Sequence, residues 1–151
     1  MPDRIEKEIF LRAPIDRVWR ALADTREFGR WFGADLPEGA FTSGARVRGP
    51  ITYEGYEHLH FDVVVERVEP PALLSMRWHP SAIDPSIDYE SEPTTLVTFL
   101  LREVEGGTQL TVTESGFDSL PEWRRSDAYR GNDEGWSEQM RNIERHVDSS
   151  A

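Results

Sequence analysis

The sequence contains no cysteine among its 151 residues. This absence excludes disulfide bonds, thiolate catalysis and zinc sites built from cysteine. No apolar run comes near the roughly 20 residues that a membrane-spanning helix needs, and the chain enters a strand-like pattern without an apolar signal region. We therefore expect a cytoplasmic protein with no membrane insertion.

Positive charge is scarce and scattered along the sequence. There are 17 basic against 28 acidic residues, a formal net charge of −11, and Lys7 is the single lysine. Nucleic-acid binding depends on clusters of basic side chains that displace counterions from phosphates. The nearest approach to a cluster, Arg124-Arg125, stands between Glu122 and Asp127. We therefore expect no nucleic-acid partner.

Familiar catalytic and metal-binding motifs are also missing. The sequence has no Gly-x-Ser-x-Gly, no glycine-rich phosphate loop and no His-Glu-x-x-His. His58 and His60 would face the same way on a strand, and two histidines with a carboxylate can hold zinc or iron. Because no second segment supplies an obvious third ligand, we predict neither a metal nor a cofactor.

The residues that are present predict one domain over residues 1–151, a usual domain length. Ile5 to Leu11 alternates loosely between apolar and polar residues, which indicates a first strand. Ala13-Pro14 then opens a helix whose apolar stripe has the spacing i, i+3, i+4 and i+7. A second, short helix is expected from Thr25 to Trp31.

Period-two alternation dominates the middle of the chain and predicts antiparallel strands. The expected strands are Arg46 to Tyr53, Leu59 to Val68, Leu73 to His79, Thr94 to Glu103 and Thr108 to Ser115. Pro70-Pro71 predicts a turn, and residues 80–93 a long exposed loop. The end of the chain predicts two helices, Pro121 to Arg130 and Asp133 to Val147, interrupted at Gly131-Asn132. The expected class is α+β, a curved antiparallel sheet around a long C-terminal helix.

Five segments carry a resemblance to a known family. They are IFLRAPIDRVWRALAD (9–24), FGRWFG (28–33), VERVEPPALLSMRW (65–78), GGTQLTVTESGF (106–117) and YRGNDEGWSEQMRNIERHV (129–147). With their order, the chain resembles the START-like, Bet v 1-like or SRPBCC superfamily with the helix-grip fold. Within it, the chain is most similar to homologues of the activator of heat-shock protein 90 ATPase. The resemblance implies a cavity between sheet and helix, and not a particular reaction.

A cavity of this kind would be lined mostly by apolar side chains. The predicted ligand-binding residues are Trp31, Phe32, Phe61, Met76, Trp78, Val97, Phe99, Val112, Glu114, Trp136 and Met140, with Val63 and Leu110 as further candidates. For each apolar residue, the alternative is that it simply fills the core.

Glu114 is the most unusual residue of this set. It shares a strand face with Leu110 and Val112, so it would point inward with them, and Arg48 is then a candidate partner. A buried carboxylate must be paired, hydrogen-bonded or protonated. The alternative, which its place near the strand end favours, is a side chain that reaches water at the rim or bonds to a helix terminus. We expect His79 at the rim and His146 to complement a helix dipole.

Three functions follow from these observations. The first is non-enzymatic binding of a small apolar molecule in the central cavity. The second is a cyclase-like or hydrolase-like activity in which an acid or base comes from Glu114, His79, Tyr53 or Tyr56. The third is an interaction protein that assists a chaperone or regulator. A homodimer or a chaperone contact is the matching expectation for macromolecular partners.

Overall fold

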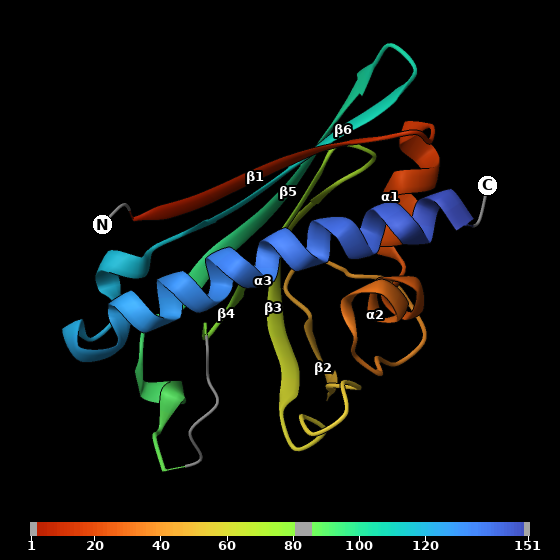
Figure 1. The fold of residues 1–151 in the computed structure, drawn as a ribbon. Coiled ribbons are helices and arrows are strands. Elements are labelled where there is room, and N and C mark those ends of the chain that lie inside the picture. Colours follow the sequence, from red (N-terminus) through yellow and green to blue (C-terminus); the bar gives the residue numbers. More distant parts are fainter. Residues whose placement is uncertain (1–2, 81–85, 150–151) are drawn as a thin grey trace.

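The computed structural model describes residues 3–80 and 86–149 (Figure 1). Within them lies a six-stranded antiparallel sheet with the strand order β1-β6-β5-β4-β3-β2. The elements are β1 (Arg4–Leu11), α1 (Ile15–Ala23), α2 (Thr25–Phe32), β2 (Arg46–Pro50), β3 (His60–Glu69), β4 (Leu73–Trp78), a 3₁₀ turn η1 (Tyr89–Ser91), β5 (Thr95–Val104), β6 (Gly107–Ser115), a 3₁₀ turn η2 (Phe117–Ser119) and α3 (Glu122–Ser149).

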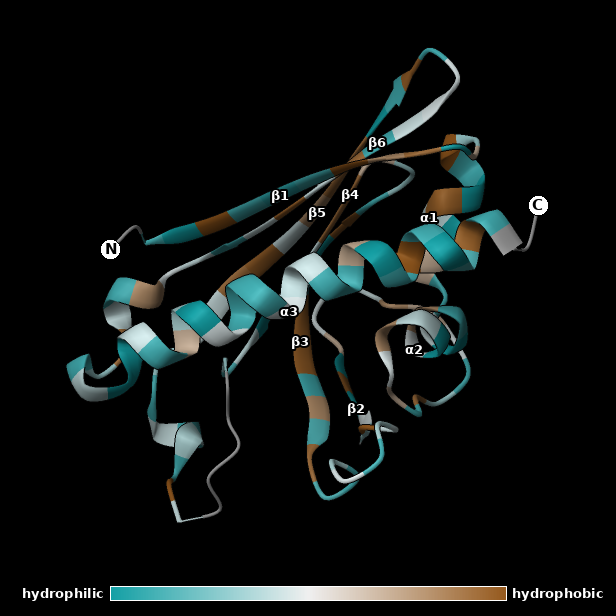
Figure 2. Ribbon diagram, in the orientation of Figure 1, coloured by the Kyte–Doolittle hydropathy of each residue, from teal (hydrophilic) through white to brown (hydrophobic). Residues whose placement is uncertain are grey.

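The helix α3 crosses one face of the curved sheet, and α1 and α2 lie near its C-terminal end (Figure 1). Strands β3 to β5 carry the most hydrophobic residues, whereas α3 is mainly hydrophilic, broken by apolar positions (Figure 2). This arrangement confirms the predicted α+β helix-grip architecture. No helix in the described segments combines the length and apolar character that crossing a bilayer requires.

Strict alternation along β6 fixes the face on which Glu114 lies. Every second residue from Thr108 to Glu114 is buried, as expected for a strand with one face against the core. Glu114 is opposite Ile5 of β1 and Val97 of β5. The carboxylate therefore enters the core from an interior strand of the sheet, although it lies one residue from the end of that strand.

Local sequence accounts for both ends of α2. Asp24 caps the helix, because its Oδ1 accepts a hydrogen bond from the backbone N–H of Glu27 at 2.9 Å. Gly33 ends the helix with a φ of 100°, a left-handed conformation that favours glycine. A Cβ at this position would also lie only 2.7 Å from the ring of Tyr53.

The predicted break at Gly131-Asn132 was wrong, because α3 runs without interruption for 28 residues. A glycine inside a helix costs about 1 kcal/mol relative to alanine. Asn132 offsets that cost through side-chain hydrogen bonds to Glu114. Ala128, Trp136 and Met140 continue a buried stripe on the same helix face, so tertiary packing outweighs local propensity.

Two other boundaries differ from expectation. β2 ends at Pro50 rather than at Tyr53, and Ile51 forms an isolated bridge with Ala34 instead. In the predicted loop of residues 80–93, positions 81–85 lie outside the described residues, and the part near its end contains η1. Pro70-Pro71 forms the predicted turn between β3 and β4, with a cis peptide bond.

Candidate functional site

Aromatic rings occupy the space between the sheet and α3. The ring of Phe28 lies 4.7 Å from that of Trp31 and 5.1 Å from that of Phe32, measured between centroids. Trp78 and Trp136 stack at 5.8 Å. Most of the predicted ligand-binding residues are buried in this aromatic core, and none of these lines the pocket between β3 and β4. They are Trp31, Met76, Val97, Phe99, Val112, Glu114, Trp136 and Met140.

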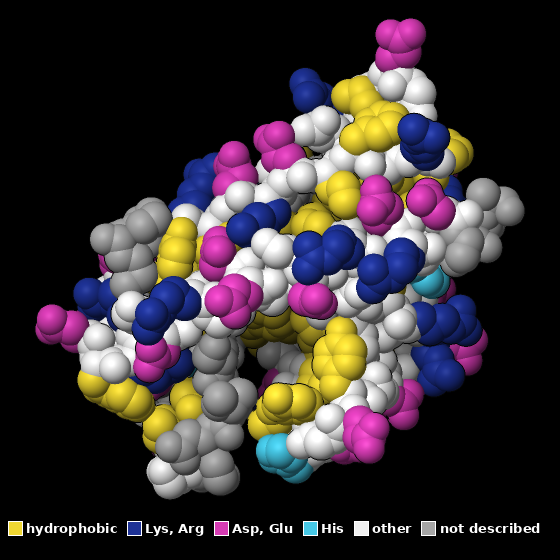
Figure 3. Space-filling model, viewed as in Figure 1, with side chains coloured by type: hydrophobic (Ala, Val, Ile, Leu, Met, Phe, Trp, Pro, Cys, Tyr) yellow, Lys and Arg dark blue, Asp and Glu magenta, His cyan; other side chains and the backbone are white. Residues whose placement is uncertain are grey.

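A pocket of about 530 Å³ opens where β3 and β4 separate. The pairing of these strands ends at Val64 and Arg77. Beyond this point β3 follows β2 as far as His60, while β4 follows β5 as far as Trp78. The hollow is visible below α3 in Figure 3. The separation of two neighbouring strands therefore creates the opening.

The inner wall of this pocket is aromatic and contains three of the predicted residues, Phe32, Phe61 and Trp78. The rings of Phe32 and Phe61 meet edge to face at 5.2 Å, and Phe61 lies 6.2 Å from Trp78. Such contacts hold the rings in fixed positions. Ile51 and Leu59 extend the apolar surface toward the mouth.

The rim of the pocket is polar. It includes the carboxylate of Asp62, which accepts hydrogen bonds from Arg46 at 2.6 and 2.8 Å. These bonds lower the pKa of Asp62; burial opposes them to a smaller extent, and the charges of Arg46, Arg48 and His79 add to the lowering. The Asp62 carboxylate is thus already engaged by arginine.

The histidines of the sequence prediction also lie here: His58, His60 and His79 all line the pocket. Nε2 of His79 is 3.1 Å from the backbone carbonyl oxygen of Glu92. Because a carbonyl oxygen only accepts hydrogen bonds, Nε2 is the donor in this contact. Across residues 3–80 and 86–149, no three His, Cys, Asp or Glu side chains are grouped closely enough to hold a metal ion.

Glu114 lies directly behind the inner wall and is fully buried. Its Oε2 accepts hydrogen bonds from the Trp78 indole at 2.8 Å and the Thr95 hydroxyl at 2.6 Å. Its Oε1 accepts one from the Trp136 indole at 2.8 Å, and the Asn132 amide donates to both oxygens at 2.9 and 3.0 Å. The favoured prediction of a water-exposed rim position was wrong, and the inward orientation is correct.

Arg48 is not the partner of Glu114, which corrects the predicted pair. Its guanidinium lies 3.4 Å from Asp62 on an exposed part of the sheet. Neutral N–H and O–H donors satisfy the buried carboxylate instead, and such donors form strong hydrogen bonds to a charged acceptor. Because Trp78 and Asn132 also line the pocket, Glu114 fixes the position of two wall residues.

The four acid–base candidates from the sequence are dispersed. Glu114 does not line the pocket, and both of its oxygens accept hydrogen bonds from protein donors. Tyr53 lies in a different depression, and Tyr56 is 58% exposed. Of these four residues, His79 alone borders the pocket.

Arg124 secures the outer wall of the pocket and was not recognised in the sequence. This residue of α3 is only 6% exposed. Its Nε donates to Glu92 at 2.8 Å and its Nη1 to the carbonyl of Pro80 at 2.9 Å, while its guanidinium lies 4.9 Å from the ring centre of Tyr89. Arg124 stands four residues before Ala128 on the buried stripe, a spacing that could have revealed it.

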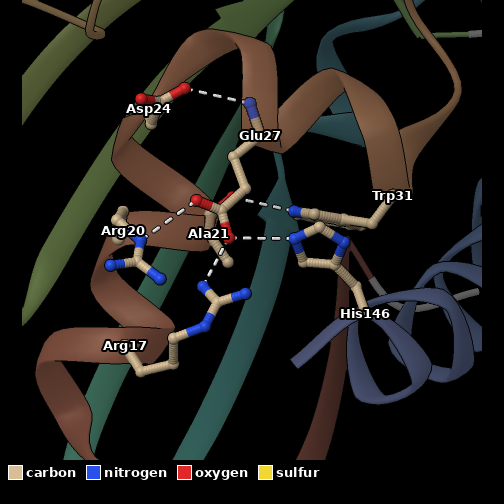
Figure 4. A network of polar contacts seen from close by, with 7 residues as sticks. All are labelled: Arg17, Arg20, Ala21, Asp24, Glu27, Trp31 and His146. Atoms are coloured by element: carbon tan, nitrogen blue, oxygen red, sulfur yellow. Dashed lines mark hydrogen bonds and ion pairs between the residues drawn. The ribbon is translucent and has the colours of Figure 1, made fainter. Parts of the chain in front are cut away.

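A second buried carboxylate, Glu27, joins α1, α2 and α3 (Figure 4). It accepts hydrogen bonds from Arg17 and from Arg20 at 3.2 Å, and its Oε1 lies 2.9 Å from Nε2 of His146. Burial raises the pKa of Glu27, but the hydrogen bonds and charges of His146 and Arg17 together outweigh it, so the net pKa is below its ordinary value. His146, expected to complement a helix dipole, thus contacts a specific carboxylate.

Comparison with known proteins agrees with this fold. The family model described as Activator of Hsp90 ATPase homolog 1-like protein matches residues 12–148. Protein MLL2253 from Mesorhizobium loti is 28% identical, with a TM-score of 0.76 and 98% of each chain covered. BH1534 from Bacillus halodurans is 24% identical, with a TM-score of 0.71 and 97% of each chain covered, and shows likeness of fold.

A further solved structure is longer than this chain. DynU16, described as a protein in the dynemicin biosynthetic locus, is 25% identical, with a TM-score of 0.75. The match covers 99% of this chain but 49% of DynU16, so this chain spans about half of that protein. A search of the curated proteins found no match.

Proposed function

The chain belongs to the Activator of Hsp90 ATPase homolog 1-like protein family, and from this premise we propose that it is a non-enzymatic binding protein for a small, mostly hydrophobic molecule. The ligand occupies the pocket between β3 and β4. Its apolar body lies against Phe32, Phe61 and Trp78, and a polar group faces the rim. The observation that carries the proposal is the aromatic inner wall of this 530 Å³ opening.

The size and the chemistry of the pocket both support binding. Small-molecule sites typically measure about 300–1,000 Å³ and combine apolar walls with a few polar groups. The aromatic wall is fixed from behind by Glu114 and the outer wall by Arg124. Preformed walls reduce the entropy that a ligand must lose on binding.

Two carboxylates at the pocket, Glu114 and Asp62, are both engaged by protein groups, and this favours binding over catalysis. The buried carboxylate Glu114 is turned toward protein donors, away from the pocket space. The carboxylate of Asp62 is engaged by Arg46 and Arg48. Neither group stands ready to exchange a proton with a bound molecule.

Filling the pocket tests the proposal. We expect the neutral dye N-phenyl-1-naphthylamine to bind with a saturable rise in fluorescence. The double variant Ile51→Trp, Leu59→Trp places two bulky side chains in the opening and should weaken binding about tenfold, through steric exclusion. The matched control is Val64→Trp, Leu100→Trp, because these residues are 48% and 47% exposed. Equal affinity of both double variants would contradict the proposed location.

A further inference from the structure

A second depression, of about 410 Å³, lies between α2 and the C-terminal half of α3. Arg30 lines it from α2, and Asn142, Arg145 and His146 line it from α3. Tyr53 contributes a wall from the loop after β2. It shares no lining residue with the apolar pocket. This second depression is therefore a separate feature with a different chemistry.

Its two arginines differ from most basic residues of this chain. Arg141, one helical turn from Arg145, pairs with Glu138 at 3.3 Å. Arg30 and Arg145 form no ion pair with any residue of the described segments. The chain has 28 acidic and 17 basic residues, so partners for a cation are plentiful elsewhere. Two arginines that line one depression and have no ion-pair partner in the described part of the chain are thus unusual here.

The nearby carboxylate does not neutralise them. Glu27 already accepts hydrogen bonds from Arg17 and Arg20 and contacts His146. Basic side chains lie along the C-terminal half of α3 and beside α2, with acidic side chains among them (Figure 3). Among the residues that the structure describes, Arg30 and Arg145 thus stand without an acidic partner on a protein that carries a formal net charge of −11.

A chain of side-chain amides holds Arg145 in place. The amide of Gln139 donates to the backbone carbonyl of Phe32 at 2.9 Å, and the amide of Asn142 donates to Oε1 of Gln139 at 3.0 Å. Oδ1 of Asn142 in turn accepts a hydrogen bond from Arg145. A free arginine side chain samples many rotamers and loses that freedom when it binds. This relay restricts that freedom before any ion is present.

We propose that this depression binds the carboxylate or phosphate group of a small molecule, held by the guanidinium groups of Arg30 and Arg145. The planar fork of arginine matches the oxygens of both anions, and such hydrogen bonds are strengthened by charge. The volume of the depression suits a small molecule. The site does not depend on the proposed apolar pocket, and each can be tested without the other.

Titration with citrate and with inorganic pyrophosphate tests the site, at an ionic strength held constant with sodium chloride. We expect saturable shifts of the backbone amide signals of Arg30, Gly33 and Arg145 in ¹H–¹⁵N spectra. Arg30→Gln and Arg145→Gln should each weaken binding about tenfold, the effect of one charge-assisted contact. Arg145→Lys keeps the charge but loses the fork, so its affinity should fall between wild type and Arg145→Gln.

Arg141→Gln is the matched control, since it removes an equal charge from the same helix but from outside the depression. It should leave the affinity unchanged, and circular dichroism of each variant verifies folding. An equal loss in Arg141→Gln would reduce the effect to diffuse attraction and overturn the site. A short polyglutamate peptide serves as a second probe. If it binds more tightly than citrate, and this binding requires Arg30 and Arg145, the ligand is an acidic protein segment, which would overturn the small-molecule assignment.

Discussion

Two buried glutamates in this chain are stabilised in opposite ways. Glu114 receives neutral donors, two indoles, an amide and a hydroxyl. Glu27 contacts His146 and the guanidinium groups of Arg17 and Arg20 instead. A carboxylate far from water needs partners of some kind, but only charged partners bind it through ion pairs that salt weakens. The neutral network suits a rigid wall, and the charged network suits a junction of helices near the surface.

Replacing Glu114 by Leu should produce the largest effect. The change leaves the indoles of Trp78 and Trp136 and the hydroxyl of Thr95 without their acceptor in the core. Unfolding by guanidinium chloride should show a loss of about 3–5 kcal/mol, because each of several buried donors left without an acceptor costs about 1–3 kcal/mol. The exposed Glu103→Leu should stay within about 0.5 kcal/mol of wild type. A loss below about 1 kcal/mol for Glu114→Leu would mean that the neutral network is not important for stability.

Arg124→Gln should have the next largest effect, about 3 kcal/mol, because the side chain of Glu92 is only 9% exposed and loses the cation that pairs with it. Hydrogen exchange should accelerate at residues 86–92 and stay unchanged in β6. Arg141→Gln, which breaks an exposed pair with Glu138, should change stability by less than about 0.5 kcal/mol. Uniform acceleration across the sheet would show that Arg124 supports the whole fold rather than the pocket wall.

Glu27→Gln should cost about 1–2 kcal/mol near neutral pH, where a neutral amide replaces a carboxylate that accepts charge-assisted bonds. The folded-state pKa of Glu27 lies below its ordinary value of 4.5. Its stabilising contribution is therefore fully present above that value and is lost as the pH falls through the folded pKa. Urea unfolding of the two proteins between pH 7 and pH 3 should show free energies that converge at the acid end. A constant difference would contradict an ionised Glu27.

Asp24→Ala should have the smallest effect, about 1 kcal/mol, because it removes the cap from the N-terminus of α2. If the lost stability comes from the capping hydrogen bond alone, the loss in Asp24→Ala should be equal at low and at high salt. Thermal unfolding of Asp24→Asn, which can still cap the helix, should remain near that of wild type. If both variants lose the same stability, the charge of Asp24 rather than its cap is responsible.

Much of the fold could be predicted from periodicity. The strand alternation and the hairpin of β5 and β6 depend on residues close in sequence, so local pattern is sufficient. The continuity of α3 depends on Asn132 meeting Glu114, a contact between distant parts of the chain. Local propensity at Gly131-Asn132 indicated a break, and tertiary hydrogen bonds override it.

The candidate site was less accessible to sequence reasoning. The inward face of Glu114 followed from alternation with Leu110 and Val112, but its donors come from β4, β5 and α3. The pocket itself depends on the separation of β3 from β4, a feature of sheet geometry that no residue pattern encodes. Hence the sequence identified the aromatic residues without distinguishing the wall of a pocket from the filling of a core.

The central claim is that a ligand enters the opening between β3 and β4 and not the packed core between α3 and the sheet. Intermolecular nuclear Overhauser effects from bound N-phenyl-1-naphthylamine to methyl groups test it most directly. We predict contacts to the methyl groups of Ile51 and Leu59, which line the opening. Contacts to the methyl groups of Val112 and Met140 instead would place the dye in the core and contradict the account.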